Sequence, residues 1–427
     1  MSAWFAVTVF AGAYVLIATE WVHRVKVALV GAGLMVAGGV LGADDVFYEP
    51  ETGVDWNVIF LLLGMMVIVG VIKQTGVFEY LAIWAAKRAR GDPYRVLVLL
   101  CLITAVASAG LDNVTTVLLV APVTLLVCDR IGVAPVPYLI AEALASNIGG
   151  AGTLIGDPPN LIIASRAGLG FNDFLVNLGP IVVVLLVVFV LVSRVLFRDA
   201  FVADPERVDA VMQLTEREAI ADVRLLVLSA VVLVLVLAGF VTQELTGVEP
   251  ALVALLGAGV LVLVSGLESR TYLAEIEWET LLFFAGLFVM VGALVATGVV
   301  EQVATYLAEL VAGNLALAVI VLLVASAVLS AIVDNIPYVA TMAPVVAAVM
   351  AGDPALQGQD VLWWALALGA DLGGNATAIG ASANVVVTGI AARSGNPISF
   401  WEFTKYGSVV AALTIVLCIP YLYLRYL

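Results

Sequence analysis

The sequence predicts an all-α protein that crosses a membrane many times and is built from two inverted-topology repeats. Three observations predict this fold class. First, hydrophobic residues make up 63% of the 427 residues and charged residues only 12%, whereas soluble domains contain about 25% charged residues. Second, apolar runs close to the roughly 20 residues that span a bilayer recur from end to end. Third, the second half of the chain repeats the pattern of the first.

The apolar runs have the length of membrane helices. A membrane β-barrel would instead show short segments of alternating polarity. The first run has no basic flank before it and no small-residue cleavage site after it, so we expect a retained helix and not a signal peptide. The runs lie at residues 4–19, 27–41, 58–72, 181–196, 225–241, 252–264 and 409–422.

Composition excludes several kinds of site and partner. Cys101, Cys128 and Cys418 form no CxxC pair and no metal-ligand spacing, so neither a disulfide framework nor a zinc site is predicted. The single histidine, His23, lies in a short charged loop and is expected at the membrane interface. A net charge of −15 argues against nucleic acid as a partner. No HExxH or GxSxG motif occurs, so we expect neither an enzyme nor a cofactor.

Two long segments separated by 222 residues share one pattern. Trp56 matches Trp278 in this register, and Thr75-Gly76 match Thr297-Gly298. The same separation relates Ser108 to Ser330, Asp112-Asn113 to Asp334-Asn335, and Ala121-Pro122 to Ala343-Pro344. Further along, "SNIGGAGTLIGDPPN" matches "DLGGNATAIGASAN" at a separation of 224 residues. Chance does not keep one register over such a distance, so the sequence indicates an internal duplication.

Each repeat is expected to contain the same series of elements. Three spanning helices come first, followed by an amphipathic segment at residues 78–90 in the first repeat. Two apolar arms, residues 96–108 and 114–127, then meet at Gly-Leu-Asp-Asn. A helix interrupted by the glycine-rich stretch and a last spanning helix complete the repeat. If the arms form a re-entrant hairpin, each repeat crosses five times, and this odd number inverts the second repeat.

The distribution of basic residues predicts the orientation. With the loop of Arg24 and Lys26 inside, all eighteen Lys and Arg residues lie on the cytoplasmic side except Arg166 and Arg425. This is a strong positive-inside bias. Both chain termini then lie outside the cytoplasm, and the charged linker at residues 198–222 lies inside. We expect an integral, multi-pass protein of the plasma (inner) membrane.

Polar residues at membrane depth are costly, so they indicate function. Here they occur in matched pairs, at the two hairpin tips and at the two glycine-rich breaks. A helix broken inside the bilayer frees backbone groups that only protein or a water-filled cavity can satisfy. Inverted repeats with broken helices are typical of secondary transporters, in which freed carbonyls bind cations and half-helix N-termini face anions. The pattern therefore predicts transport of a small ion.

The candidate substrate- and ion-binding residues come from these four segments. Carboxylates can hold Na⁺ or exchange a proton, amides can donate or accept, and glycines let the backbone approach an ion. The possible Na⁺ sites are Asp112, Asn113 and Gly149 in the first repeat, and Asp334, Asn335 and Gly373 in the second. The full set is Ser108, Asp112, Asn113, Thr115, Asn147, Gly149, Gly150, Thr153, Asp157, Asn160, Ser330, Asp334, Asn335, Asp371, Gly373, Gly374, Asn375, Thr377 and Asn384.

The two breaks differ chemically. Asp157 precedes Pro158-Pro159 in the first, whereas the second has Ala381-Ser382-Ala383, and Asp371 stands where the first has Asn147. We therefore expect Asp157 to take part in ion coupling. Glu142 can face the same cavity or belong to the core. The structural alternative for any one residue is that Asp-Asn caps a helix and glycine serves close helix packing.

The motifs "LDNVTTVLLVAPVT" and "IAEALASNIGGAGTLIGDPPNLII" resemble the ArsB/NhaD permease family of the ion transporter superfamily, in its arsenite permease and melanosomal P-protein-like branch. The resemblance covers nearly the whole chain. It implies a homodimer and an elevator-type movement of a transport domain against a scaffold. The repeats then comprise residues 1–197 (scaffold helices 3–90, transport elements 94–197) and 223–427 (scaffold helices 223–312, transport elements 314–427), joined by the linker.

The function that this resemblance implies is arsenite efflux coupled to H⁺ or Na⁺. Because the three cysteines form no cluster, oxygen and amide groups would hold the oxyacid. The alternatives are a Na⁺/H⁺ antiporter and an anion channel or transporter of the P-protein type. A Na⁺-coupled dicarboxylate transporter is less favoured, because that branch has Ser-Asn-Thr at the hairpin tips. Here the tips carry Asp112 and Asp334, which would repel a dicarboxylate.

Overall fold

The computed structural model describes residues 2–19, 21–201, 215–311, 314–352, 354 and 356–427. All regular secondary structure in these residues is helical, and no strand occurs among them. Nine of the helices in these ranges are long and apolar enough to cross a membrane. The part of the chain that the structure describes is therefore a polytopic helical membrane protein, as predicted.

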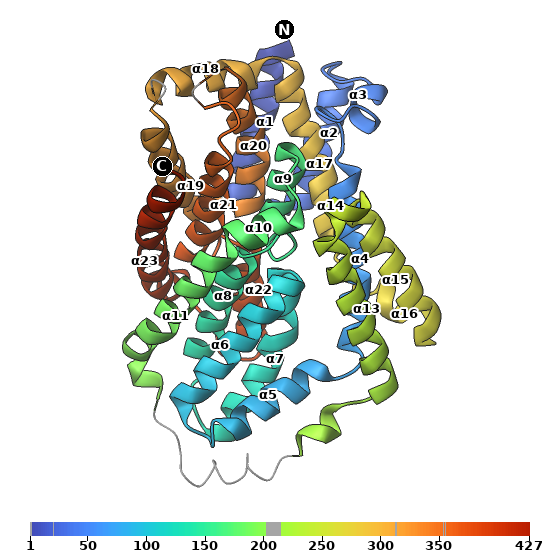
Figure 1. The fold of residues 1–427 in the computed structure, drawn as a ribbon, viewed down its shortest axis with the longest axis vertical. Coiled ribbons are helices and arrows are strands. Elements are labelled where there is room, and N and C mark those ends of the chain that lie inside the picture. Colours follow the sequence, from blue (N-terminus) through green and yellow to red (C-terminus); the bar gives the residue numbers. More distant parts are fainter. Residues whose placement is uncertain (1, 20, 202–214, 312–313, 353, 355) are drawn as a thin grey trace.

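The first half of the chain has helices at the predicted apolar runs, two long hairpin arms and a helix that breaks at the glycine-rich stretch (Figure 1). Its elements are α1 (Ser2–Ala18), α2 (Arg24–Ala37), α3 (Ala43–Phe47), α4 (Trp56–Lys73), α5 (Val77–Arg88), α6 (Pro93–Gly110), α7 (Asn113–Ile131), α8 (Val136–Gly150), α9 (Pro158–Ala167), α10 (Phe171–Asn177), α11 (Gly179–Leu196) and the short helix η1 (Arg198–Ala200). Of the three predicted leading spans, α4 has the length to cross a membrane, whereas α1 and α2 are shorter.

The second half has a corresponding series of elements. They are η2 (Glu216–Ala219), α13 (Val223–Val241), α14 (Gln243–Thr246), α15 (Pro250–Ser265), α16 (Ser269–Leu273), α17 (Trp278–Ala296), α18 (Val299–Val311), α19 (Leu315–Ile332), α20 (Asn335–Gly352), α21 (Val361–Gly373), η3 (Gly374–Ala376), α22 (Ser382–Arg393) and α23 (Phe400–Tyr426).

Local signals set the helix boundaries. Asp92 accepts a hydrogen bond from the Arg95 N–H at 2.9 Å and so caps α6, whose first residue is Pro93. Asp55 caps α4 in the same way through the N–H groups of Asn57 and Val58. Such a cap satisfies backbone donors that have no partner within the helix. The polar residues just before these apolar runs therefore mark where each helix begins.

One set of helices, which we call the α4–α17 group, comprises α1, α2, α4, α13, α15 and α17. Within it α4 packs on α15, and α17 packs on α2. Glycine permits both close approaches: a Cβ atom at Gly64 would lie 2.8 Å from the backbone of Ala254, and one at Gly286 would lie 2.8 Å from that of Ala28. The same contact thus occurs twice, each time between helices from different halves of the chain.

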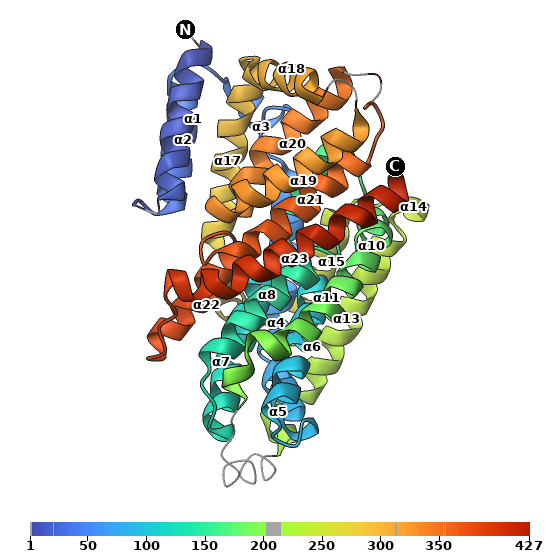
Figure 2. The same ribbon diagram turned by 90° about the vertical axis from the view of Figure 1, so that its left-hand side faces the viewer.

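A second set of helices, which we call the α8–α21 group, comprises α6–α9, α11 and α19–α23. Here α6 packs on α8, and α19 packs on α21. Beyond each break, α9 packs against α20 and α22 packs against α7. In Figure 2 the red helix α23 runs diagonally between the orange helices α19–α21 above it and the cyan and green helices α6–α8 below it. The two broken helices therefore lie in the interior, against one another.

The hairpin arms are longer than the sequence suggested. α6 and α19 have 18 residues and α7 has 19, so by length each can cross a bilayer. The arms meet in sharp turns inside the molecule, at Leu111-Asp112 and at Val333-Asp334. In Figure 1 the α6–α7 turn and the α19–α20 turn point toward each other from opposite ends of the structure.

The linker residues that follow the undescribed segment are attached to α5. Lys87 donates to the Glu216 carboxylate at 2.5 Å, and this hydrogen bond holds the pKa of Glu216 below its ordinary value. The Ala221 N–H donates to the Thr75 carbonyl at 3.0 Å. Gly76, in a left-handed conformation at φ 75°, leaves room for the Ala219 carbonyl. The second half is thereby joined to the start of α5.

Candidate ion-binding site between the two broken helices

The site lies where two helices break in the interior of the molecule. α8 ends at Gly150 and α9 begins at Pro158, while α21 ends at Gly373 and α22 begins at Ser382. Proline has no N–H to donate and its ring fixes a helical φ angle, so Pro158 favours the start of a helix there. Each break leaves backbone groups without helical partners at a depth where water is scarce.

Matched hydrogen bonds hold each hairpin turn against its neighbouring break. Ser108 donates to the Ser146 carbonyl at 2.8 Å, and Ser330 donates to the Ala370 carbonyl at 2.6 Å. A second bond follows in each half. Thr153 donates to the Ala109 carbonyl at 2.6 Å, and Thr377 donates to the Ala331 carbonyl at 2.7 Å. These hydroxyl donors therefore serve to join the hairpins to the breaks.

The glycines of the breaks permit close packing. A Cβ at Gly149 would lie 2.2 Å from the Ala105 carbonyl oxygen, and one at Gly373 would lie 2.4 Å from the Ala327 Cα. Gly150 packs in the same way against Gly156, as Gly374 does against Gly380. The side of each glycine on which another residue would carry its Cβ is thus packed against protein backbone. That their carbonyl groups bind an ion stays a prediction.

An asparagine amide stabilises each break from within. The Asn160 amide donates to the Thr153 carbonyl at 3.0 Å, and the Asn384 amide donates to the Gly374 and Thr377 carbonyls at 2.9 Å. These bonds satisfy carbonyls that the break has freed. Buried amides of this kind specify one arrangement, because each unmade bond is costly.

Asn147 connects the two halves directly. Its amide nitrogen donates to the side-chain oxygens of Asn375 and Asn384, each at 3.0 Å. Its side-chain oxygen accepts from the Asn113 amide at 3.1 Å. Asn147 is completely buried. The predicted amides of both breaks and of the first hairpin therefore do come together, around one side chain.

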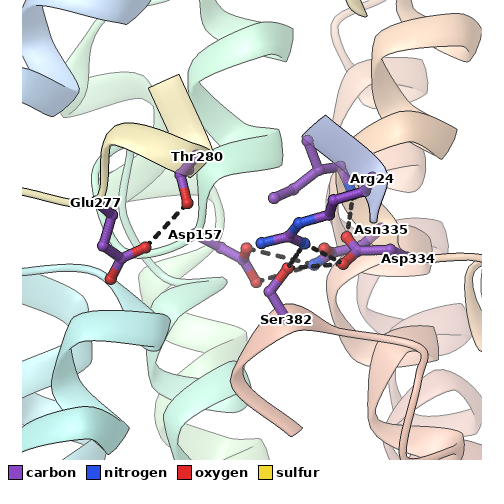
Figure 3. Close-up of polar contacts among 8 residues, drawn as sticks. Arg24, Asp157, Glu277, Thr280, Asp334, Asn335 and Ser382 are labelled. Carbon is purple, nitrogen blue, oxygen red and sulfur yellow. Dashed lines mark hydrogen bonds and ion pairs between the residues drawn. The ribbon is translucent and has the colours of Figure 1, made fainter. Parts of the chain in front are cut away.

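Two carboxylates lie buried beside this amide cluster. The Asn335 amide donates to both oxygens of Asp157 at 3.3 Å, as Figure 3 shows. Neither oxygen of Asp371 has a hydrogen-bond partner among the described residues, although the Asn160 side chain lies near. The two carboxylates are close enough for their charges to interact. No Lys, Arg or His in the described ranges forms an ion pair with either.

The hairpin-tip aspartates differ from this inner pair. Asp112 caps α7 by accepting from the Thr115 N–H at 2.8 Å. Asp334 accepts from the Ile336 N–H at 3.0 Å, and its second oxygen accepts from Arg24 at 3.1 Å and from the Ser382 hydroxyl at 2.6 Å. Asp112 therefore caps a helix, and Asp334 both accepts from a backbone N–H and pairs with Arg24. The predicted acidic residues thus do not all form one cluster.

Sequence reasoning missed three residues at this site. Arg24 at the start of α2 reaches Asp334, and Ser382 lies between them (Figure 3). Glu277, the N-cap residue of α17, accepts from the Thr115 hydroxyl at 3.4 Å and from the Thr280 hydroxyl at 2.9 Å. One signal was available: Glu277 corresponds to Asp55 in the 222-residue register. The role of Arg24 depends on a contact between residues 310 positions apart.

Glu142 lies apart from these contacts. It is buried and accepts a 2.5 Å hydrogen bond from the Thr124 hydroxyl, between α7 and α8. Its other oxygen has no partner among the described residues. Cys101 and Cys128 lie near it. It thus occupies the core between the hairpin and α8.

A cavity of about 590 Å³ lies away from the inner carboxylates. Its walls are apolar residues of α17 and α20, and its polar rim includes Glu51, Asp55, Arg166 and Glu301. Arg166 donates to the Glu51 carbonyl at 3.2 Å, and Ser165 donates to Asp55. Neither Asp157 nor Asp371 lines it. The inner carboxylates therefore do not face this cavity.

The side chains present suit a monovalent cation or a proton better than a transition metal. No group of three or more His, Cys, Asp or Glu residues able to hold a metal ion occurs in the described part of the chain. The three cysteines are buried and unpaired. What the centre offers is two carboxylates surrounded by amide and carbonyl oxygens, which are the ligands that hard cations prefer.

The family model described as "CitMHS: Citrate transporter" matches residues 14–369 of this chain. An uncharacterized transporter of Mycobacterium tuberculosis is 59% identical over 421 residues, which cover 99% of this chain and 98% of the relative. The P protein of Homo sapiens is 34% identical over 494 residues, covering 97% of this chain and 59% of that protein. The structure of the YdaH transporter of Alcanivorax borkumensis has a TM-score of 0.51 at 15% identity, covering 86% of this chain and 85% of that one, which shows a shared fold.

Proposed function

This chain belongs to the CitMHS citrate transporter family, and from that membership we propose that it is a secondary active transporter coupled to H⁺ or Na⁺. The observation that carries the proposal is the pair of buried carboxylates, Asp157 and Asp371, between the two broken helices. Both lie within the protein without an ion-pair partner in the described ranges. An isolated buried charge is unstable unless a cation or a proton compensates it.

The coupling ion would bind beside the inner carboxylates. Asp157 supplies two oxygens, and the Asn113 oxygen and both Asp371 oxygens are buried without hydrogen-bond partners. Unpartnered buried acceptors are rare in proteins, and a bound cation or proton would satisfy these. In this account the predicted Na⁺ sites at the hairpin tips shift inward, from Asp112 and Asp334 to Asp157 and Asp371.

Alternating access would follow from two inverted repeats. The matched hydroxyl and amide bonds, and the matched glycine contacts at Gly64 and Gly286, support a two-fold relation between the halves. The α8–α21 group then forms the transport domain, and the α4–α17 group forms the scaffold. An elevator movement would carry the broken helices across the bilayer, and a homodimer would hold the scaffolds in place.

The cargo that suits this centre is a small inorganic ion or oxyacid, as in an arsenite-efflux-type permease. Neutral hydroxyl groups can donate to the inner carboxylates and to the Asn113 and Asn160 oxygens, which have no donor partner. Free citrate carries several negative charges, and Asp157 and Asp371 would repel it unless cations accompanied it. Citrate, named in the description of the family, is therefore the second candidate cargo.

A Na⁺/H⁺ antiporter and an anion channel remain as further candidates within this family. The relation to the P protein supports keeping both. In an antiporter the cation at Asp157 and Asp371 would itself be the cargo. A channel would conduct without saturation, whereas a transporter with occluded states would show saturable exchange with a strong temperature dependence.

Counterflow in proteoliposomes tests the proposal. Purified protein is reconstituted with unlabelled arsenite, citrate or Na⁺ inside, and uptake of the same labelled compound is followed. We expect saturable counterflow for one cargo, and accumulation above equilibrium when a pH or Na⁺ gradient is imposed. Non-saturating currents in planar bilayers, with no counterflow of any cargo in the panel, would overturn the proposal.

A further inference from the structure

The ion pair between Arg24 and Asp334 connects the two helix groups. Arg24 is the first residue of α2, in the α4–α17 group, and Asp334 precedes α20, in the α8–α21 group. The guanidinium donates to Asp334 at 3.1 Å and to the Ser382 hydroxyl at 2.7 Å, and Ser382 itself donates to Asp334 at 2.6 Å. Three polar groups thus form a closed ring of hydrogen bonds across the boundary (Figure 3).

The Arg24 side chain is positioned by its own group. Its guanidinium lies over the Phe283 ring of α17, 5.3 Å from the ring centre. An arginine stacked on an aromatic face is attracted to the ring and loses less freedom when it forms a hydrogen bond. Only 31% of the Arg24 side chain and 13% of the Asp334 side chain are exposed. The pair is therefore ordered and partly shielded from water.

The other half of the chain has no equivalent of this contact. Gly286 faces Ala28 as Gly64 faces Ala254, so α2 and α15 correspond, and Pro250 stands at the start of α15 where Arg24 starts α2. In the 222-residue register Phe283 corresponds to Leu61. Neither a cation nor an aromatic ring is present at the equivalent position.

A cavity lies beside the equivalent position. Leu61 and Pro250 line a cavity of about 260 Å³ whose opposite wall includes Leu161 and Ala164 of α9. On the Arg24 side, by contrast, the start of α22 touches Arg24 through Ser382. On the α15 side the α8–α21 group contacts α4 through Ser165 and Asp55, but no ion pair among the described residues joins the two groups there.

We propose that Arg24 is a positioning residue that stabilises only one of the two end states of the transporter, by acting as a tethered counter-ion for Asp334. The inference rests on the proposed function. In a transporter with inverted repeats, each repeat adopts in the inward-facing state the conformation that the other repeat has in the outward-facing state. In the opposite state the contact would fall between Asp112 and Pro250, which has no charge to offer. The transported ion must therefore shift an equilibrium that Arg24 biases.

Crosslinking of the two groups tests this. Ser165 of α9 donates to Asp55 at the start of α4, so cysteines at both positions report the state seen here. The native cysteines are buried and leave a low background. In the full-length D55C/S165C protein, we expect R24Q to lower the oxidised fraction roughly twofold or more, the size expected for a partly exposed ion pair. R24K should keep most of the oxidised fraction, because lysine retains the positive charge.

Matched variants separate this role from a general loss of structure. K26Q removes a neighbouring exposed charge and should crosslink like the parent protein. D334N should resemble R24Q, and the double variant should fall no further, because the two residues act through one contact. Equal crosslinking in R24Q and the parent would overturn the inference. Failure of counterflow in the parent overturns the proposed function, whatever the crosslinking shows.

Discussion

At the residue scale, Asn147 is the side chain on which the centre depends most. It contacts amides of the first hairpin and of the second break. We expect Asn147→Ala to lower the free energy of unfolding by about 1–3 kcal/mol for each buried amide left unsatisfied. Thermal unfolding in detergent measures this. Asn57→Ala, at an exposed position of α4, is the control, and equal effects of the two would contradict the arrangement.

The matched hydrogen bonds of the centre were predictable from the sequence in part. Ser108 has a partner 222 residues further on, and Thr153 and Asn160 have partners 224 residues further on. Each makes the same hydrogen bond as its partner. That these residues bind an ion stays a prediction. Arg24 and Ser382 were not selected, because their chemistry depends on a contact between distant segments that no local pattern encodes. Glu142 was left open between cavity and core, and it lies in the core.

At the element scale, the hairpins and breaks pack through glycine. We expect Gly149→Ala and Gly373→Ala each to destabilise the protein by about 1–3 kcal/mol, the usual cost of overpacking, because the new methyl group would meet the backbone of α6 or α19 at 2.2–2.4 Å. Gly33→Ala in α2 is the control, since no atom lies within 4 Å of its added Cβ. The packing account fails if all three variants unfold at the same temperature.

The linker contact can be tested by proteolysis. Removing the acceptor in Glu216→Gln weakens the bond from Lys87, so trypsin should cleave after Arg217 roughly twofold faster or more, as for loss of a surface ion pair. Glu218→Gln changes a neighbouring exposed residue and should leave the rate unchanged. Unchanged cleavage in Glu216→Gln would show that this ion pair does not hold the segment against α5.

At the scale of the whole molecule, the charge bias predicts the orientation of the chain in the membrane. We expect a cysteine at Glu49, in the exposed loop before α4, to react with a membrane-impermeant maleimide in intact cells. A cysteine at Glu218, in the linker, should react only after permeabilisation. The reverse pattern would invert the predicted topology and place both termini in the cytoplasm.

The positions of the helices were predictable, because apolar runs and glycine-rich breaks are local features of the sequence and their recurrence shows the duplication. The depth to which the hairpins enter the molecule was not predictable from the sequence. Their arms are as long as spanning helices, and only the packing of α6 on α8 and of α19 on α21 places the two turns inside. The division of contacts between the two helix groups depends on tertiary packing, which sequence periodicity does not encode.

Gradient-driven uptake by carboxylate variants tests the central claim most directly. In proteoliposomes with an imposed pH or Na⁺ gradient, the wild-type protein should accumulate its cargo. Asp157→Asn and Asp371→Asn should lose this accumulation, because an amide cannot exchange a proton or neutralise a cation. Accumulation at the wild-type level in both variants would contradict the claim that the two buried carboxylates bind the coupling ion.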